Sequence, residues 1–184
     1  MSPLLVAIVC ACINGLLAAM CSNTALTDAD RAVITNKHNA LRSSLARGTA
    51  RTNSGNAPGG SNIYKLQWDC AIEASAQAWA NQCKFDHSDP ARTAQNLGEN
   101  LATSFMTTTS AQLIESADMW WNEILNYKIT RTSVIMTAAV FNTNVGHFTQ
   151  MAWGSTTKLG CGVKSCGTYR ITVCRYSLPY VTTL

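Results

Sequence analysis

The sequence predicts a single disulfide-stabilised domain of the α+β class, and three observations support this prediction. Three stretches between residues 27 and 126 repeat apolar side chains at helical spacing. Two alternating runs, residues 159–164 and 169–176, flank a Gly-containing turn and predict a β-hairpin. Six cysteines follow an apolar N-terminal segment, which is typical of a small secreted domain with disulfides. The chain has 184 residues and no internal repeat, which fits one domain with its own core.

The N-terminal segment is predicted to be a secretory signal peptide. The first twenty residues carry no charge, and residues 4–19 are almost entirely apolar and end in small side chains. The positive charge that usually opens such a segment is absent. An uncleaved anchor is the alternative, but the run is short and polar in its middle. We expect cleavage near residues 19–21, with residues 1–20 as the signal peptide, residues 21–184 as the domain, and no stable membrane insertion.

The cysteine spacing favours disulfides over a zinc site. Cys10 and Cys12 would leave with the signal peptide. No CxxC pair occurs, and the remaining spacings do not suit a zinc ribbon. Cleavage after Cys21 would leave five cysteines and one unpaired thiol, so the position of the cut matters. The six that remain after cleavage before Cys21 are Cys21, Cys70, Cys83, Cys161, Cys166 and Cys174.

The charge pattern argues against nucleic-acid binding. Charged residues make up only 13% of the chain, and the net charge of +4 is not gathered into a run of Lys or Arg. A nucleic-acid surface would need such clustering. The sequence also contains no Asn-x-Ser/Thr sequon, so N-glycosylation is not expected.

The first helix is expected to begin after Thr27, because Asp30 stands three residues further on, as in a capping box. Gly48 is placed to end it. Residues 49–62 are rich in Gly, Asn, Ser and Thr and are predicted to form a loop. His38 lies on or beside the apolar stripe of this helix, which consists of Val33, Ile34, Leu41 and Leu45.

The second helix is expected over about residues 69–82, since its many alanines favour helix. Residues 84–100 are predicted to form a loop that leads into a short strand. A third helix is predicted near residues 110–126, with Leu113, Ala117, Trp120 and Ile124 as its stripe and Glu123 at its edge. Residues 127–145 are harder to assign: Val134 to Val140 fit a strand, a short helix or a mobile apolar loop, and the sequence does not decide among them.

The stretch from Gly146 to Trp153 combines polar and apolar side chains around one histidine. Gly146 allows a close backbone approach or a positive φ angle. Phe148, Met151 and Trp153 can be buried, whereas Thr149 and Gln150 offer polar contacts. Taken alone, a histidine beside aromatic residues is more often a satisfied core residue than a functional one.

Four separated motifs change that interpretation: His38-Asn39-Ala40-Leu41-Arg42, Gly98-Glu99-Asn100-Leu101, Gly146-His147-Phe148-Thr149-Gln150-Met151-Ala152-Trp153 and Val173-Cys174-Arg175-Tyr176. In this order and spacing the chain resembles the CAP superfamily, also called SCP/TAPS. That superfamily includes cysteine-rich secretory proteins, insect-venom antigen 5 and plant pathogenesis-related proteins of class 1. The chain is most similar to the activation-associated secreted, or venom allergen-like, proteins of parasitic nematodes. The resemblance covers about residues 21–178.

The resemblance implies a three-layer α-β-α sandwich around a small antiparallel sheet, with a central cleft lined by His87, Glu99, Glu123 and His147. His38 matches a histidine that is structural in the family. Two neutral imidazoles can bind a divalent ion such as Zn²⁺ or Mg²⁺, but two protein ligands predict weak, non-obligatory binding. The alternative is that the four side chains only satisfy one another in a polar cluster.

The resemblance also implies two disulfides, Cys161–Cys174 and Cys83–Cys166, which leaves Cys21 to pair with Cys70. Each bridge of this kind contributes roughly 2–4 kcal/mol. The chain departs from the family after about residue 178, where a Pro-Gly-Asn type turn is usual. We therefore expect a divergent or truncated C-terminus, without the cysteine-rich domain found in some relatives.

The function that the resemblance implies is that of a secreted, non-enzymatic protein that binds a sterol or fatty acid, host proteins, or both. Five apolar side chains of the segment 133–141 are expected to contact lipid, unless they pack into the core: Val134, Ile135, Met136, Val140 and Phe141. One alternative is a protein-binding immunomodulator with a vestigial cleft. Another is a metal-assisted hydrolase with Glu99 or Glu123 as base, although no Gly-x-Ser-x-Gly or His-Glu-x-x-His motif occurs. A monomer or a weak dimer is expected.

Overall fold

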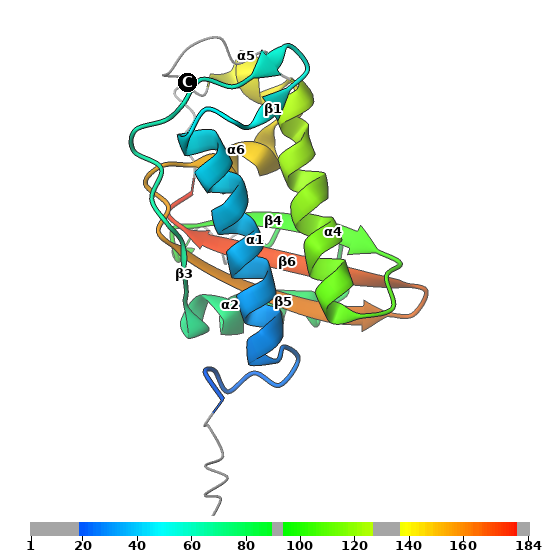
Figure 1. Cartoon of the computed structure of the whole chain (residues 1–184). Helices are drawn as coiled ribbons and strands as arrows, with labels where there is room; N and C mark the ends of the chain where they lie inside the picture. Colours follow the sequence, from blue (N-terminus) through cyan, green and yellow to red (C-terminus); the bar gives the residue numbers. More distant parts are fainter. Residues whose placement is uncertain (1–18, 90–93, 127–136, 180–184) are drawn as a thin grey trace, which may run out of the picture.

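A computed structural model of the chain describes residues 19–89, 94–126 and 137–179 (Figure 1). Its centre is a four-stranded sheet with the strand order β3-β5-β6-β4. The three long strands run antiparallel, as expected, and the two-residue strand β3 adds a parallel edge beside β5. The strands are β3 Gln67–Trp68, β4 Leu97–Ser104, β5 Lys158–Cys166 and β6 Tyr169–Ser177.

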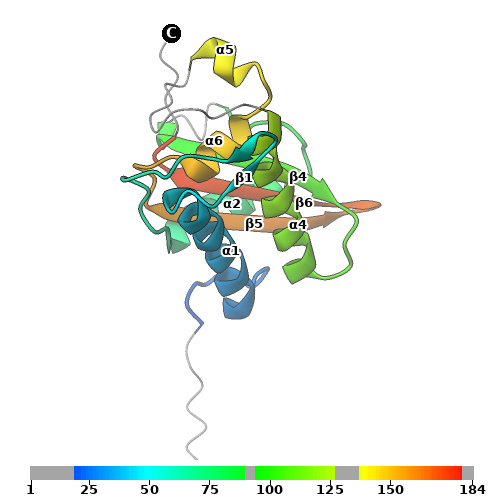
Figure 2. The same ribbon diagram turned by 45° about the horizontal axis from the view of Figure 1, so that its top comes forward.

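Helices cover both faces of this sheet and form the three-layer α-β-α sandwich that the resemblance implied (Figures 1 and 2). Helix α2 packs on β5 and β6, α4 and α6 pack on β4, and α1 packs on α4. The helices are α1 Asp28–Ala46, α2 Cys70–Ala80, α4 Thr109–Asn122 and α6 Gly146–Ala152. The short elements are β1 Arg51–Thr52, β2 Gly55–Asn56, the 3-10 helix η1 Glu123–Asn126 and α5 Ala138–Phe141.

The larger part of the hydrophobic core lies around α1, α4 and α6 and includes inward side chains of the sheet. All four stripe residues predicted for the third helix are buried there, with Leu113 and Trp120 among the best-buried side chains. A smaller cluster centres on Ala76 and Ala80 of α2. No helix in the three described ranges is long and apolar enough to cross a bilayer.

Both ends of α1 lie where the sequence predicts them. Thr27 Oγ1 accepts a hydrogen bond from the N–H of Asp30 at 3.1 Å, and the Asp30 carboxylate accepts one from the N–H of Thr27 at 3.0 Å. This reciprocal cap satisfies two N–H groups that a helix otherwise leaves without partners. At the other end Gly48 has a φ of +68°, which side chains with a Cβ rarely adopt.

Two glycines on β5 allow α2 to lie directly against the sheet. A Cβ at Gly160 would stand 2.2 Å from the backbone N of Glu73, and a Cβ at Gly162 would stand 2.4 Å from the Cα of Gln77. Any side chain at either position would push the helix backbone away, because close-packed interiors do not absorb such overlaps. The contact between α2 and the sheet therefore depends on these two residues.

All three predicted disulfides are confirmed. Cys161 and Cys174 face each other across β5 and β6, with Cα atoms 4.1 Å apart. Cys83, just after α2, is joined to Cys166 at the end of the hairpin, 83 residues further along the chain. Cys21 is joined to Cys70, the first residue of α2. The bridges thus connect the N-terminal segment, α2 and the hairpin.

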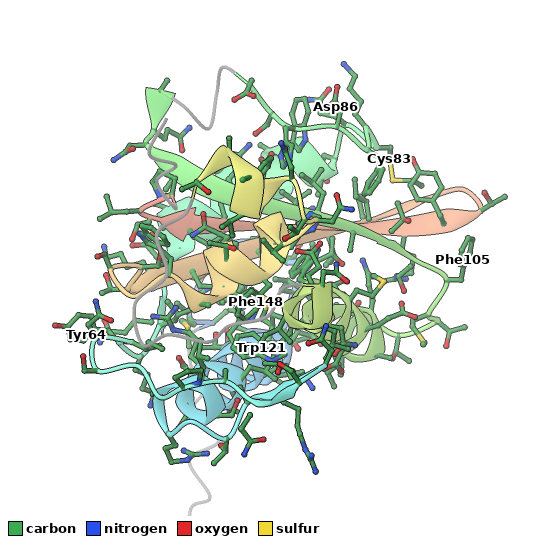
Figure 3. All side chains as sticks on the ribbon, turned by 90° about the horizontal axis from the view of Figure 1, so that it is seen from above. Tyr64, Cys83, Asp86, Phe105, Trp121 and Phe148 are labelled. Carbon is green, nitrogen blue, oxygen red and sulfur yellow. A yellow bond between two sulfur atoms is a disulfide. The ribbon has the colours of Figure 1, made fainter. Side chains whose placement is uncertain are left out.

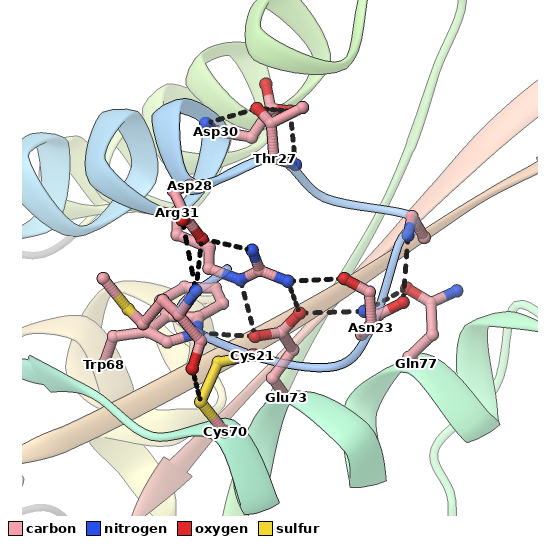
Figure 4. A network of polar contacts seen from close by, with 12 residues as sticks. Cys21, Asn23, Thr27, Asp28, Asp30, Arg31, Trp68, Cys70, Glu73 and Gln77 are labelled. Atoms are coloured by element: carbon pink, nitrogen blue, oxygen red, sulfur yellow. Dashed lines mark hydrogen bonds and ion pairs between the residues drawn. A yellow bond between two sulfur atoms is a disulfide. The ribbon is translucent and has the colours of Figure 1, made fainter. Parts of the chain in front are cut away.

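A buried ion pair joins α1 to α2 near the Cys21–Cys70 bridge (Figure 4). The Arg31 guanidinium donates from Nε to Glu73 Oε2 at 2.9 Å and from Nη2 to Glu73 Oε1 at 2.7 Å. Trp68 Nε1 donates to Glu73 Oε2 at 2.6 Å, and Asn23 Nδ2 donates to Glu73 Oε1 at 2.9 Å. Every lone-pair direction of the fully buried carboxylate is therefore used, which offsets its loss of hydration.

A second buried arginine, Arg42 on α1, has no carboxylate partner among the described residues and binds backbone carbonyls instead. Its Nε and Nη2 donate to the Tyr64 carbonyl, at 2.8 and 2.6 Å. Its remaining donors reach Met151, Trp153 and Thr156, at 2.7, 2.9 and 3.1 Å. Burial lowers the pKa of Arg42 to about 10, so the side chain still carries its charge at neutral pH.

The structure differs from some of the sequence predictions, and other predictions fall on residues that it does not describe. The loop over 49–62 contains the small hairpin β1–β2, and the third helix ends at Asn122 and continues as the 3-10 turn η1. Part of the segment 127–145 forms α5, with Val140 packed against the core and Phe141 40% exposed. Val134, Ile135 and Met136, like the predicted signal peptide up to residue 18, lie outside the described residues.

Replacing Arg42 with methionine should lower the free energy of unfolding by roughly 3 kcal/mol or more, because five hydrogen bonds from a buried side chain lose their donor. Chemical denaturation followed by tryptophan fluorescence measures this change. Arg47→Met, at the exposed end of the same helix, is the matched control and should change stability by less than about 0.5 kcal/mol. Similar small losses in both variants would contradict the role assigned to Arg42.

Candidate functional site

Four predicted site residues line a single pocket of about 330 Å³. His87 lies in the loop after α2, Glu99 on β4, Glu123 at the start of η1, and His147 in the first turn of α6. The pocket wall also includes Phe141 of α5, one of the residues predicted to contact lipid. Residues from five separate segments of the chain therefore meet at one place.

The first histidine is held by the buried carboxylate of Glu99. His87 Nδ1 donates to Glu99 Oε1 at 2.9 Å, and the backbone N–H of Ser88 donates to the same oxygen at 3.0 Å. Ser88 Oγ donates to Glu99 Oε2. Because a carboxylate only accepts, the proton of a neutral His87 stands on Nδ1, and its Nε2 lone pair remains available.

The second histidine is held in the same way by Glu123. His147 Nδ1 donates to Glu123 Oε1 at 2.6 Å, and the backbone N–H of Phe148 donates to Glu123 Oε2 at 3.0 Å. In both pairs a carboxylate binds the Nδ1 of a histidine and the N–H of the next residue. Glu123 also supplies a negative charge to the first turn of α6, which has no side-chain cap of its own.

Among the described residues, Glu99 is paired with an arginine, whereas Glu123 has no lysine or arginine partner. The Glu99 carboxylate accepts from Arg175 Nε at 2.9 Å, and the two residues are register partners on β4 and β6. Glu123 has no lysine or arginine within ion-pair distance among the described residues. With neutral imidazoles the described residues of the site therefore carry one net negative charge, which favours a bound cation.

Burial by itself raises the pKa of Glu99. Hydrogen bonds from His87, Ser88 and Arg175 stabilise the ionised form more strongly and lower the pKa to about 2. Glu99 therefore remains a carboxylate at any physiological pH. Its role in the site is to hold His87 and to pair with Arg175, because its two oxygens are occupied by these donors.

His147 is further positioned by groups that sequence reasoning did not assign. Trp120 stacks on its ring, with centroids 6.2 Å apart, and Asn100 Nδ2 donates to its carbonyl at 3.1 Å. Asn100 Nδ2 also contacts the hydroxyl of Tyr176 at 3.3 Å, which in turn lies 3.0 Å from His38 Nε2. His38 is fully buried and does not line the pocket; burial lowers its pKa to about 4.

The packing of α6 against α4 completes the support beneath the site. Trp121 and Phe148 meet edge to face with ring centroids 5.1 Å apart (Figure 3).

Ser88, Asn100 and Arg175 are the polar residues of the site to which the sequence alone gave no role. Asn100 and Arg175 stood inside the quoted motifs, and Ser88 directly follows His87, so proximity to motif residues was the available signal.

The donor set fits a weakly held divalent ion. Each imidazole is oriented through Nδ1 by a carboxylate, as in carboxylate–histidine–metal arrangements, which leaves Nε2 to bind. No three of the pocket's histidine and glutamate side chains bring ligand atoms within 4.8 Å of one another in the described structure. Cys21, Cys70 and Glu73 do meet that distance, but both sulfurs are in a disulfide and cannot act as thiolates.

The ion pair between Glu99 and Arg175 should make the free energy of unfolding depend on pH. Its folded-state pKa of about 2 lies below the ordinary value of 4.5, so its contribution is complete above about pH 5 and is lost as the pH falls toward 2. The free-energy difference between wild type and Glu99→Gln should therefore shrink over this range. Urea denaturation at a series of pH values measures it, and a difference that does not vary with pH would count against the assignment. Asp118→Asn, which removes a half-exposed carboxylate and its surface ion pair with Lys37, is the control.

Known proteins of similar sequence include a secreted protein and a venom allergen. The chain is 38% identical over 161 residues to the Ancylostoma secreted protein of Ancylostoma caninum, covering 84% of this chain and 38% of that protein. It is 37% identical over 145 residues to venom allergen 3 of Solenopsis invicta, covering 77% and 62%. The chain thus spans less than two thirds of either relative.

Solved structures show the same fold. A crystal structure of NaASP2 with Zn²⁺ superposes with a TM-score of 0.80 at 32% identity, covering 87% of this chain and 85% of that one. BmVAL-1 superposes with a TM-score of 0.79 at 36% identity, covering 86% and 81%. A profile of the cysteine-rich secretory protein family matches residues 35–176. The chain belongs to this CAP family.

Proposed function

We propose that this protein is a secreted, non-enzymatic CAP protein whose central pocket binds a divalent metal ion through Nε2 of His87 and His147. The observation that carries the proposal is the repeated arrangement of carboxylate, Nδ1 and backbone N–H at the two histidines. This arrangement fixes the proton of each neutral histidine on Nδ1, so that the Nε2 lone pairs are available to bind a metal ion. A bound ion would supply a Lewis-acidic charge at the pocket. The negative charge of Glu123, which has no lysine or arginine partner among the described residues, favours it.

Relatives support the secreted, metal-binding reading. NaASP2, at 32% identity, has been crystallised with Zn²⁺, and the Ancylostoma relative is named a secreted protein. Three disulfides are typical of an oxidising compartment. With only two histidine ligands, the ion should exchange readily and Mg²⁺ should compete poorly, since imidazole suits zinc better than magnesium.

The non-enzymatic reading is supported by the partners of the two histidines. In the described structure neither His87 nor His147 hydrogen-bonds a hydroxyl or thiol that could act as a nucleophile. The oxygens of Glu99 are occupied by His87, Ser88 and Arg175, which leaves this carboxylate poorly placed to act as a base toward water.

A second candidate function is the binding of a sterol or fatty acid beside the same pocket. Phe141 lines the pocket, and its side chain is 40% exposed. The other part of its ring packs closely over Gly146, where a Cβ would stand only 3.0 Å from the ring. An exposed aromatic ring at a pocket wall favours an apolar ligand. Val140 packs against the core and is a weaker candidate, and host proteins are the alternative partner if no lipid binds.

Metal binding is tested by titrating Zn²⁺ into the secreted protein in a calorimeter. His87→Ala and His147→Ala should each weaken binding at least about tenfold, because each removes one of two ligands. Glu123→Gln should weaken it by roughly 10–100-fold by releasing His147 and removing charge. Asp118→Asn should bind as the wild type does. Unchanged affinity in both histidine variants, with thermal unfolding intact, would leave the pocket as a self-satisfied polar cluster.

Lipid binding is tested by extraction and mass spectrometry of protein purified without detergent, followed by titration with cholesterol and a fatty acid. Phe141→Ser should lose most of any affinity because it removes the apolar wall. Phe105→Ser is the matched control, since Phe105 is 81% exposed and lies at the far end of β4. If no lipid is extracted and none titrates, the lipid proposal is wrong and protein partners become the next target.

A further inference from the structure

The segment before α1 ends in a contact that suits a charged N-terminus. The backbone N of Met20 lies 3.1 Å from both carboxylate oxygens of Asp28. The Asp28 carboxylate also pairs with Arg31 Nη1 at 2.7 Å and stands in the first turn of α1. A peptide N–H donates one hydrogen, whereas a free ammonium donates three and adds a full positive charge.

Met20, Cys21 and Asn23 each contact the folded domain, and Figure 4 shows the contacts of Cys21 and Asn23. Cys21 is buried and bridged to Cys70, and the Met20 carbonyl lies 3.3 Å from Cys70 Sγ. Asn23 binds Glu73 through its side chain and Arg31 through its carbonyl. Ala19, in contrast, is exposed and makes no hydrogen bond to any described residue.

We propose that the chain is cleaved between Ala19 and Met20, and that the released α-amino group of Met20 forms an ion pair with Asp28. Hydrolysis of this peptide bond adds one water, leaves a carboxylate on Ala19, and gives Met20 an amine that takes up a proton below its pKa. The side chain before the cut would be the small Ala19, as signal peptidases require. The cut that the domain boundary at residue 21 implies, one residue later, would place the bulky Met20 there, so the proposed cut shortens the expected signal peptide by one residue.

Two charged side chains surround the proposed N-terminal ammonium of Met20. The groups that face it are the Asp28 carboxylate and, across that carboxylate, the Arg31 guanidinium, which is itself bound to Glu73. Asp28 then lies between two cations. Its position in the first turn of α1 also lets it complement the positive end of the helix. The mature N-terminus therefore contributes to the fold instead of hanging free in solvent.

The cleavage position is tested by secreting the full chain from a eukaryotic host and determining its intact mass and N-terminal sequence. The proposal expects a mature protein that begins Met-Cys-Ser-Asn. A protein that begins at Cys21, at Ala19 or at any other residue overturns it. The cleavage rests on the secretion that the proposed function includes. It does not depend on metal or lipid binding, so a different N-terminus overturns this inference and leaves the proposed pocket ligands untouched.

The ion pair is tested with two proteins of defined N-terminus, one beginning at Met20 and one extended by Ala19, released from cleavable fusions. At about pH 6.5 the Met20 form should melt roughly 1–3 °C higher, because only it places an ammonium at Asp28. Asp28→Asn should abolish this difference, while Asp118→Asn should preserve it. Equal melting temperatures, or a difference that survives Asp28→Asn, would show that no such pair forms.

Discussion

The buried cation of Arg42 holds several separate parts of the chain together. Its guanidinium replaces lost hydration with carbonyl oxygens from three separate stretches, at Tyr64, at Met151 to Trp153, and at Thr156. These carbonyl dipoles offset the loss of hydration of the buried charge, although no carboxylate pairs with it among the described residues. Because two of these carbonyls belong to the end of α6, the same contact holds the helix that carries His147 against α1.

The layers of the sandwich are joined by satisfied polar groups as well as by apolar packing. Glu73 with Arg31 and Glu99 with Arg175 are buried pairs in which both partners have further hydrogen bonds. Such pairs add little net stability, because desolvation offsets attraction. Removing one partner is costly, however, so each pair favours one arrangement of the elements over its alternatives. The Glu99–Arg175 pair in this way fixes the carboxylate that binds His87.

The two histidine arms of the pocket are chemically alike but electrostatically unequal. On one side Arg175 neutralises Glu99, and on the other Glu123 keeps its charge near His147. A cation in the pocket would therefore interact more strongly with the α6 side. Phe141 brings an apolar surface to the same opening, so a polar and an apolar ligand group could be held next to each other.

The sequence by itself determined the local features of this protein. Helix caps, the alanine-rich helix and the C-terminal hairpin follow from residue types within a few positions, and the family resemblance identified the disulfide pairs and the four pocket residues. Only the tertiary structure decided how those residues act. The partners of Glu99 come from positions 12, 11 and 76 residues away, and the cap of α6 comes from Glu123, 25 residues before Phe148. Such partners depend on strand register and helix packing, which no local pattern encodes.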